Sequence, residues 1–170
     1  MSKTFYIINE HELLRIGTAS YIEKNSDWKS LGDAPDIEKA FSDFESFAKN
    51  GEMPSVVISD LNFYGKDTGF ELVKRFHELY PQQKIIVYSM FFAPGIVQNA
   101  IQSGACGYVS KNATSNELLA CMEKALLRHL SNDEIAEKMN LKKRAVENYI
   151  SAIYEKTNII DRAELIRRFG

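Results

Sequence analysis

The sequence predicts an α/β protein in which a doubly wound, five-stranded parallel sheet is followed by a small all-α helix-turn-helix module. One observation is that five short apolar runs alternate with five amphipathic segments up to residue 127. A second is that residues 55–63, SVVISDLNF, contain a β-branched run typical of a strand buried on both faces of a parallel sheet. A third is that residues 128–170 contain only helix signals. We therefore expect two domains, residues 1–127 and residues 128–170.

Composition narrows the class of protein. The 170 residues are 45% hydrophobic and 26% charged, which is enough for a domain core plus a small module. The net charge of −2 gives no nucleic-acid signature for the chain as a whole. Residues 1–127 carry 12 Lys and Arg against 16 Asp and Glu, whereas residues 128–170 carry 9 against 7, so the C-terminal part weakly favours nucleic-acid binding. No secretory signal or membrane-length apolar run occurs, so we expect a cytoplasmic protein without a membrane partner.

Five strands are expected, the second of them weak and at an edge of the sheet. They are placed over residues 4–8, 29–34, 56–59, 84–88 and 106–109. Five helices follow them, each marked by apolar residues at helical spacing. These residues are Leu13, Leu14, Gly17 and Tyr21; Ile37, Phe41, Phe44 and Phe47; Phe70, Val73, Phe76 and Leu79; Ile96, Val97, Ala100 and Ile101; and Leu118, Leu119, Met122 and Leu126.

Polar residues follow four of the predicted strands: Glu10, Asp60, Ser89 and Lys111. The carboxyl ends of parallel strands meet at one edge of the sheet, so these side chains are expected to converge. The chemistry indicated is phosphoryl transfer to a carboxylate, with Asp60 as the nucleophile. Glu10, Asp60 and the backbone carbonyl of Asn62 would hold Mg²⁺, and Lys111 and Ser89 would contact the phosphoryl oxygens. The alternative is four unrelated residues on a solvated rim.

The C-terminal residues contain a second pair of helix signals. A capping box at 131–134 opens a short helix, and a turn at 140–143 leads to a longer one. Two short helices joined by a tight turn are a candidate helix-turn-helix, whose second helix would enter the major groove. On periodicity alone, an ordinary helical hairpin with a solvated charged face is favoured. The candidate contacts to bases or phosphates are Lys142, Lys143, Arg144, Asn148, Ser151 and Lys156.

Residues 4–127 resemble the flavodoxin-like receiver domain of bacterial two-component response regulators. The stretches that carry the resemblance are FYIINEHELLRIG, VVISDLNF, KIIVYS and GACGYVSKNA. By position, Asp60 resembles the phosphoacceptor, Lys111 the lysine of that site, Ser89 the switch hydroxyl and Tyr108 the aromatic switch residue. The absence of a proline after Lys111 resembles the NarL/FixJ type.

The chain departs from this family at the predicted site. The family usually has two acids after the first strand, whereas this chain has Asn9 and Glu10, so Asn9 is expected to be at best a weak metal ligand. Met90 stands where a small residue usually admits the phosphoryl group. A receiver that works poorly with phosphate, or without it, is therefore an open alternative.

Residues 130–169 resemble the later part of a LuxR-type helix-turn-helix. Such modules normally begin with a further helix and a linker, and neither is present between residues 127 and 130. Either an internal segment is missing from the sequence, which we favour, or the preceding helix covers the exposed face. The part of the module present in this sequence has about 40 residues, which is near the lower size limit for independent folding.

Together, the resemblances imply a DNA-binding response regulator. Its partners would be a histidine kinase, promoter DNA and a second copy of itself in a homodimer. It would be a phosphorylated substrate with slow self-dephosphorylation, and not a turnover enzyme. The rivals are a phosphorylation-independent regulator or adaptor, and a haloacid-dehalogenase-type phosphatase. The phosphatase chemistry needs a second Asp two residues after Asp60, where this chain has Asn62.

Overall fold

The computed structural model describes residues 3–127 and residue 144. Within the described residues, five strands alternate with five helices. In chain order these are β1 Thr4–Ile8, α1 Glu12–Asn25, β2 Lys29–Ala34, α2 Ile37–Asn50, β3 Val56–Ser59, α3 Gly69–Leu79, β4 Ile85–Ser89, α4 Pro94–Gln102, β5 Gly107–Ser110 and α5 Ser115–Leu127. The predicted order of elements is confirmed.

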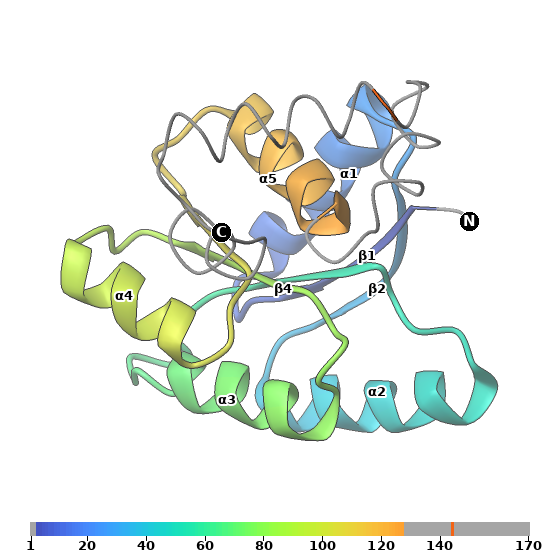
Figure 1. Cartoon of the computed structure of the whole chain (residues 1–170), viewed down its shortest axis with the longest axis horizontal. Coiled ribbons are helices and arrows are strands. Elements are labelled where there is room, and N and C mark those ends of the chain that lie inside the picture. Colours follow the sequence, from blue (N-terminus) through green and yellow to red (C-terminus); the bar gives the residue numbers. More distant parts are fainter. Residues whose placement is uncertain (1–2, 128–143, 145–170) are drawn as a thin grey trace. The chain divides into compact units, whose positions relative to one another are not determined.

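The strands form one parallel sheet with the order β2-β1-β3-β4-β5 (Figure 1). The weak second strand lies at an edge, as expected, and β3 is central and buried along its whole length. β4 and β5 each begin and end one residue later than predicted, and their last residues, Ser89 and Ser110, pair with each other in the ladder. Ser89 is therefore the last residue of its strand, next to the edge where the predicted site lies.

Helices cover both faces of the sheet. Figure 1 shows α1 and α5 on one face and α2 and α3 on the other, with α4 next to α3. An aromatic cluster fills the space between α2, α3 and the sheet. In it, the Phe44 ring centroid lies 5.5 Å from that of Tyr6 and 4.6 Å from that of Phe76. Burial of these rings is a main source of the hydrophobic stabilisation of the domain.

The opposite face contains the fully buried indole of Trp28. Its Nε1–H donates a 2.8 Å hydrogen bond to Oε1 of Glu123 on α5. The same oxygen accepts a 2.9 Å hydrogen bond from the ammonium group of Lys3. This network connects the start of β1, the loop before β2 and the last turns of α5.

The predicted apolar face of α1 is wrong in part. Leu13 is 85% exposed and Tyr21 lies at the surface, whereas Ile22 is the fully buried residue of this helix. Ile22 and the half-buried Leu14 lie eight residues apart and therefore share one face. Leu79, also expected inside, is 59% exposed because it is the last residue of α3. No described helix is both long and apolar enough to cross a membrane.

The N-terminus of α2 is capped by Asp36, whose carboxylate accepts a 2.8 Å hydrogen bond from the backbone N–H of Lys39. We expect Asp36→Ala to lower the free energy of unfolding by about 1 kcal/mol, because that N–H loses its partner. Asp36→Ser retains a capping oxygen and serves as the matched control. Urea unfolding of the three proteins measures the difference, and equal losses for both variants would contradict the capping role.

Tyr6 makes stability depend on alkaline pH. Burial raises the pKa of Tyr6 far above its ordinary value, and its hydrogen bond to the Asp43 carboxylate adds to the rise. The folded protein therefore keeps this proton while the unfolded chain releases it, so stability falls as the pH rises above about 10. We expect the fall between about pH 9 and 11 to be shallower in Tyr6→Phe. The exposed Tyr64→Phe is the control, and identical slopes in the two variants would contradict the prediction.

Candidate functional site

Asp60 follows β3 directly, at the carboxyl edge of the sheet, and is only 7% exposed. Its backbone N–H donates to the carbonyl of Ile8 at 3.0 Å, which continues the pairing of β3 with β1. Its carboxylate accepts three hydrogen bonds. Oδ1 accepts one from the backbone N–H of Leu61 at 2.7 Å, and Oδ2 accepts one from Asn9 Nδ2 at 2.9 Å and one from Lys111 Nζ. Asp60 is thus a buried and well-oriented carboxylate.

Lys111 follows β5 and reaches Asp60 from the far side of β4. Its backbone N–H donates to the carbonyl of Ser89 at 2.8 Å, which positions the lysine relative to the end of β4. Its side chain forms an ion pair with Asp60, and the two side chains are 7% and 8% exposed. Charges buried to this extent are stable only when they are paired and hydrogen-bonded. The pair therefore places a positive charge beside the predicted nucleophile.

Asn9 and Glu10 follow β1 but have different roles. Asn9 is 2% exposed, and its Oδ1 accepts a 2.8 Å hydrogen bond from the backbone N–H of His11. Oε2 of Glu10 accepts a hydrogen bond from the backbone N–H of Tyr64, a residue whose own backbone is left-handed at φ 54°. The structure therefore brings Asn9, and not Glu10, into contact with Asp60.

Arg15 is a residue of the site that sequence reasoning missed. Its guanidinium donates to the backbone carbonyl of Asn9 at 2.7 Å and to that of Glu10 at 3.2 Å, and it forms an ion pair with Asp33. These bonds fix the loop that carries Asn9. An arginine one turn into a helix is common, and nothing in its spacing distinguishes it from a solvated residue.

Ser89 ends β4 and Tyr108 lies in β5, the strands nearest to the Asp60–Lys111 ion pair along with β3. Ser89 is buried, and its hydroxyl accepts a 3.4 Å hydrogen bond from the backbone N–H of Phe91. The Tyr108 hydroxyl donates to the carbonyl of Phe91, and its ring lies 5.9 Å from that of Phe92. Burial raises the pKa of Tyr108 above its ordinary value. A hydrogen bond with Ser89 opposes the rise, and the negative charge of Asp60 adds to it. The two predicted switch residues therefore contact the same loop between β4 and α4.

Asn62 and Met90 lie in the loops that follow β3 and β4, and the metal-ligand role predicted for the Asn62 carbonyl stays a prediction. The side chain of Asn62 accepts from the backbone N–H of Gly65 at 3.0 Å and donates to Asp67 at 3.3 Å. Met90 is 58% exposed, so its side chain lies largely in solvent.

The predicted Mg²⁺ ligands do not fit a tightly held ion in this arrangement. Both oxygens of Asp60, the amide oxygen of Asn9 and Oε2 of Glu10 already accept hydrogen bonds. Among the described residues, no group of three or more His, Cys, Asp or Glu side chains could hold a metal. Mg²⁺ favours several oxygen ligands in octahedral geometry, which this set of donors does not offer.

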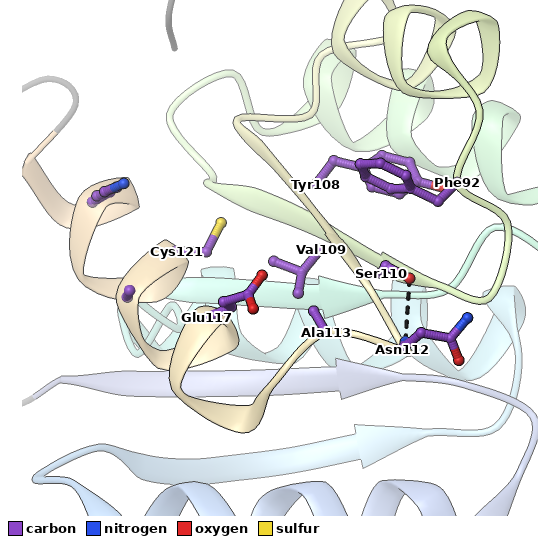
Figure 2. Close-up of a pocket in the computed structure, with 10 residues that line it drawn as sticks. Phe92, Tyr108, Val109, Ser110, Asn112, Ala113, Glu117 and Cys121 are labelled. Carbon is purple, nitrogen blue, oxygen red and sulfur yellow. Dashed lines mark hydrogen bonds between the residues drawn. The ribbon is translucent and has the colours of Figure 1, made fainter.

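A groove of about 520 Å³ lies between β5 and α5 (Figure 2). Figure 2 shows the rings of Phe92 and Tyr108 together at one side of it and residues of α5 at the other. A 3.2 Å hydrogen bond from the backbone N–H of Asn112 to the Ser110 hydroxyl holds the loop after β5. The groove thus borders Tyr108, the predicted aromatic switch residue.

The predicted DNA contacts fall mostly outside the described residues. Arg144 is helical and exposed. The other five candidates lie outside the described residues, and all six DNA contacts, like the boundary between the two domains, remain predictions.

The fold and the site first define a class: a doubly wound α/β protein with a buried carboxylate–lysine pair at the carboxyl ends of its strands. The chain belongs to the response regulator receiver domain family, which matches residues 5–123. Residues 120–169 match the luxR family of bacterial regulatory proteins, so the two matches share residues 120–123. The predicted resemblance is confirmed, and the chain is a response regulator with a LuxR-type DNA-binding module.

Known relatives agree with this assignment. The chain is 26% identical to the transcriptional activator protein ExaE of Pseudomonas putida over 123 residues, which are 72% of this chain and 55% of ExaE. It is 27% identical to the transcriptional regulatory protein DesR of Bacillus subtilis over 197 aligned positions, covering 97% of this chain and 95% of DesR. The latter alignment is longer than this chain, so DesR contains residues without a counterpart here.

A solved structure matches the fold. The two-component response regulator of the LuxR family from Aurantimonas superposes with a TM-score of 0.67 at 22% identity, over 75% of this chain and 86% of that chain. This likeness, together with the sheet order, confirms the predicted flavodoxin-like fold of the receiver domain.

Proposed function

We propose that Asp60 is the phosphoacceptor of this response regulator and that its phosphorylation by a histidine kinase, or by a small phosphodonor, controls transcription from a promoter. The observation that carries the proposal is the buried Asp60–Lys111 pair, held at the carboxyl edge of the sheet by hydrogen bonds from Leu61 and Asn9. An oriented carboxylate beside a fixed positive charge suits nucleophilic attack on a phosphorus atom.

The chemical step is a transfer of one phosphoryl group. A carboxylate oxygen of Asp60 forms a bond to phosphorus while the bond from phosphorus to the donor breaks, and the donor leaves with that electron pair. The ammonium group of Lys111 and the amide of Asn9 stabilise charge on the oxygens in transit. The Ser89 hydroxyl would then donate a hydrogen bond to one of those oxygens.

The loop between β4 and α4 connects this step to the surface. Phe91 contacts Ser89 through its N–H and Tyr108 through its carbonyl. If Ser89 moves toward a phosphoryl group, the Tyr108 hydroxyl loses or changes its acceptor, and the face formed by β5 and α5 shifts its population of conformations. This face includes the groove of Figure 2.

The output of the switch is DNA binding by the C-terminal module, in a homodimer. Its proposed contacts are those predicted from the sequence, with Lys142, Lys143 and Lys156 on phosphates and Arg144, Asn148 and Ser151 on bases or phosphates. Because promoter DNA is its target, the protein would act in the cytoplasm.

A second candidate function is supported by the hydrogen bonds of Asp60. Since Asn9, Lys111 and Leu61 already satisfy this carboxylate, the domain can also serve as a regulator or adaptor that works without phosphorylation. In that case, partner contacts alone would alter DNA binding.

The intact mass of the full-length protein, incubated with acetyl phosphate with and without Mg²⁺, separates the two. We expect a gain of one phosphoryl mass in the wild type and none in Asp60→Asn. Asp67→Asn, at an exposed carboxylate of the next loop, is the matched control and should gain the mass. No gain in the wild type under any condition would reject the phosphoacceptor role and favour the phosphorylation-independent function.

A further inference from the structure

The amide group of Asn9 lies against the carboxylate of Asp60. Its Nδ2 lies 2.9 Å from Oδ2 of Asp60, the oxygen that also pairs with Lys111. Asn9 is itself almost completely buried. An N–H group directed at a buried carboxylate provides a partial positive charge without any ion.

The orientation of this amide is set by its surroundings. Its Oδ1 accepts the backbone N–H of His11 at 2.8 Å, and the Arg15 guanidinium binds the backbone carbonyl of Asn9 at 2.7 Å. Rotating the amide by half a turn would place Oδ1 against the Asp60 carboxylate and Nδ2 against another N–H. Both contacts would be repulsive, so Asn9 presents only a donor to Asp60.

The negative charge of Asp60 is offset without a divalent cation. Asp60 and Lys111 form one buried pair, and Glu10 is directed to the N–H of Tyr64. An aspartate at position 9 would instead place a second carboxylate within hydrogen-bonding distance of Asp60. Two carboxylates so close repel each other, and a bound cation is the usual relief.

We propose that Asn9 takes the place of a divalent cation at Asp60, so that the resting receiver domain completes this site by itself and binds Mg²⁺ only weakly. The inference deepens the proposed function, because it concerns the same Asp60. It identifies Asn9 as a positioning residue that determines whether the site needs a metal.

The substitution Asn9→Asp tests the proposal. We expect isothermal titration of the full-length wild type with MgCl₂ to show no binding at concentrations up to about 1 mM, and Asn9→Asp to bind at least about tenfold more tightly. Thermal unfolding gives a second measurement: Mg²⁺ should raise the midpoint of Asn9→Asp and leave that of the wild type unchanged. Without Mg²⁺, Asn9→Asp should unfold at a lower temperature than the wild type.

Asn50→Asp is the matched control, because it adds the same charge at the exposed end of α2, before β3 begins. It should leave Mg²⁺ binding unchanged. Tight binding of Mg²⁺ by the wild type would overturn the proposal even if Asn9→Asp failed to fold. Equal Mg²⁺ affinities of the wild type and Asn9→Asp would overturn it too.

Phosphorylation of the wild type is measured separately, by mass. A wild type that binds Mg²⁺ tightly and is phosphorylated only with it would overturn this inference alone, whereas one that is never phosphorylated and binds no Mg²⁺ would overturn only the proposed phosphoacceptor role.

Discussion

Replacing Gly69 with alanine is expected to lower the free energy of unfolding by about 3 kcal/mol or more. Gly69 begins α3, and a Cβ atom built on it would lie 2.3 Å from the Cα and 2.5 Å from the carbonyl oxygen of Leu61. Both are backbone atoms, which cannot move aside as a flexible side chain can. The backbone N–H of Gly69 also donates to that carbonyl at 2.9 Å. Moving α3 away from Leu61 to admit the methyl group would therefore also break this hydrogen bond.

Gly17→Ala is the matched control for this prediction. Gly17 lies within α1, and a Cβ atom there would have no neighbour within 4 Å. Alanine has the higher helix propensity, so this variant is expected to gain about 0.5–1 kcal/mol. Urea unfolding of both variants gives the comparison. A loss below about 1 kcal/mol for Gly69→Ala would contradict the close approach of α3 to Leu61.

Replacing Lys111 with methionine is expected to destabilise the fold by about 3 kcal/mol, because it leaves the Asp60 carboxylate buried without its cation. Methionine retains most of the length of the lysine stem, so lost packing contributes little. Two hydrogen bonds to the carboxylate remain, from Leu61 and Asn9, and these limit the loss. The measurement is the free energy of unfolding in urea at neutral pH.

Two further variants make this test specific. Lys74→Met removes an exposed lysine from α3 and should change stability by less than about 0.5 kcal/mol. The double variant Asp60→Asn with Lys111→Met removes both charges, and it should lose less stability than the sum of the two single variants. Additive losses would mean that Asp60 and Lys111 do not interact in solution.

The sequence was sufficient to predict which strands carry the site. Parallel strands end at one edge of a sheet, so Asp60, Ser89 and Lys111 had to approach one another once the order of strands and helices was recognised. The buried ion pair between Asp60 and Lys111 follows from that convergence and from their opposite charges. The roles proposed for these residues in phosphoryl transfer stay predictions.

Details that depend on loops could not be predicted in the same way. Glu10 is predicted to hold a metal, and the structure adds a hydrogen bond to its carboxylate from the backbone N–H of Tyr64, which no sequence pattern indicates. The role of Asn9 depends on which end of its amide faces Asp60, which only its neighbours decide. In α1, helical spacing allowed more than one inward face, and Leu13 lies on the exposed one.

The hydrogen bond between Trp28 and Glu123 gives the protein a natural optical reporter. Trp28 is the only tryptophan in the chain, so the intrinsic indole emission has a single source. The ring is fully buried and its N–H is held by α5, the helix that ends at Leu127. Any event that draws α5 from the sheet would expose the indole to water and shift its emission to longer wavelength. A displacement of α5 from the sheet can thus be followed in unlabelled protein by fluorescence alone.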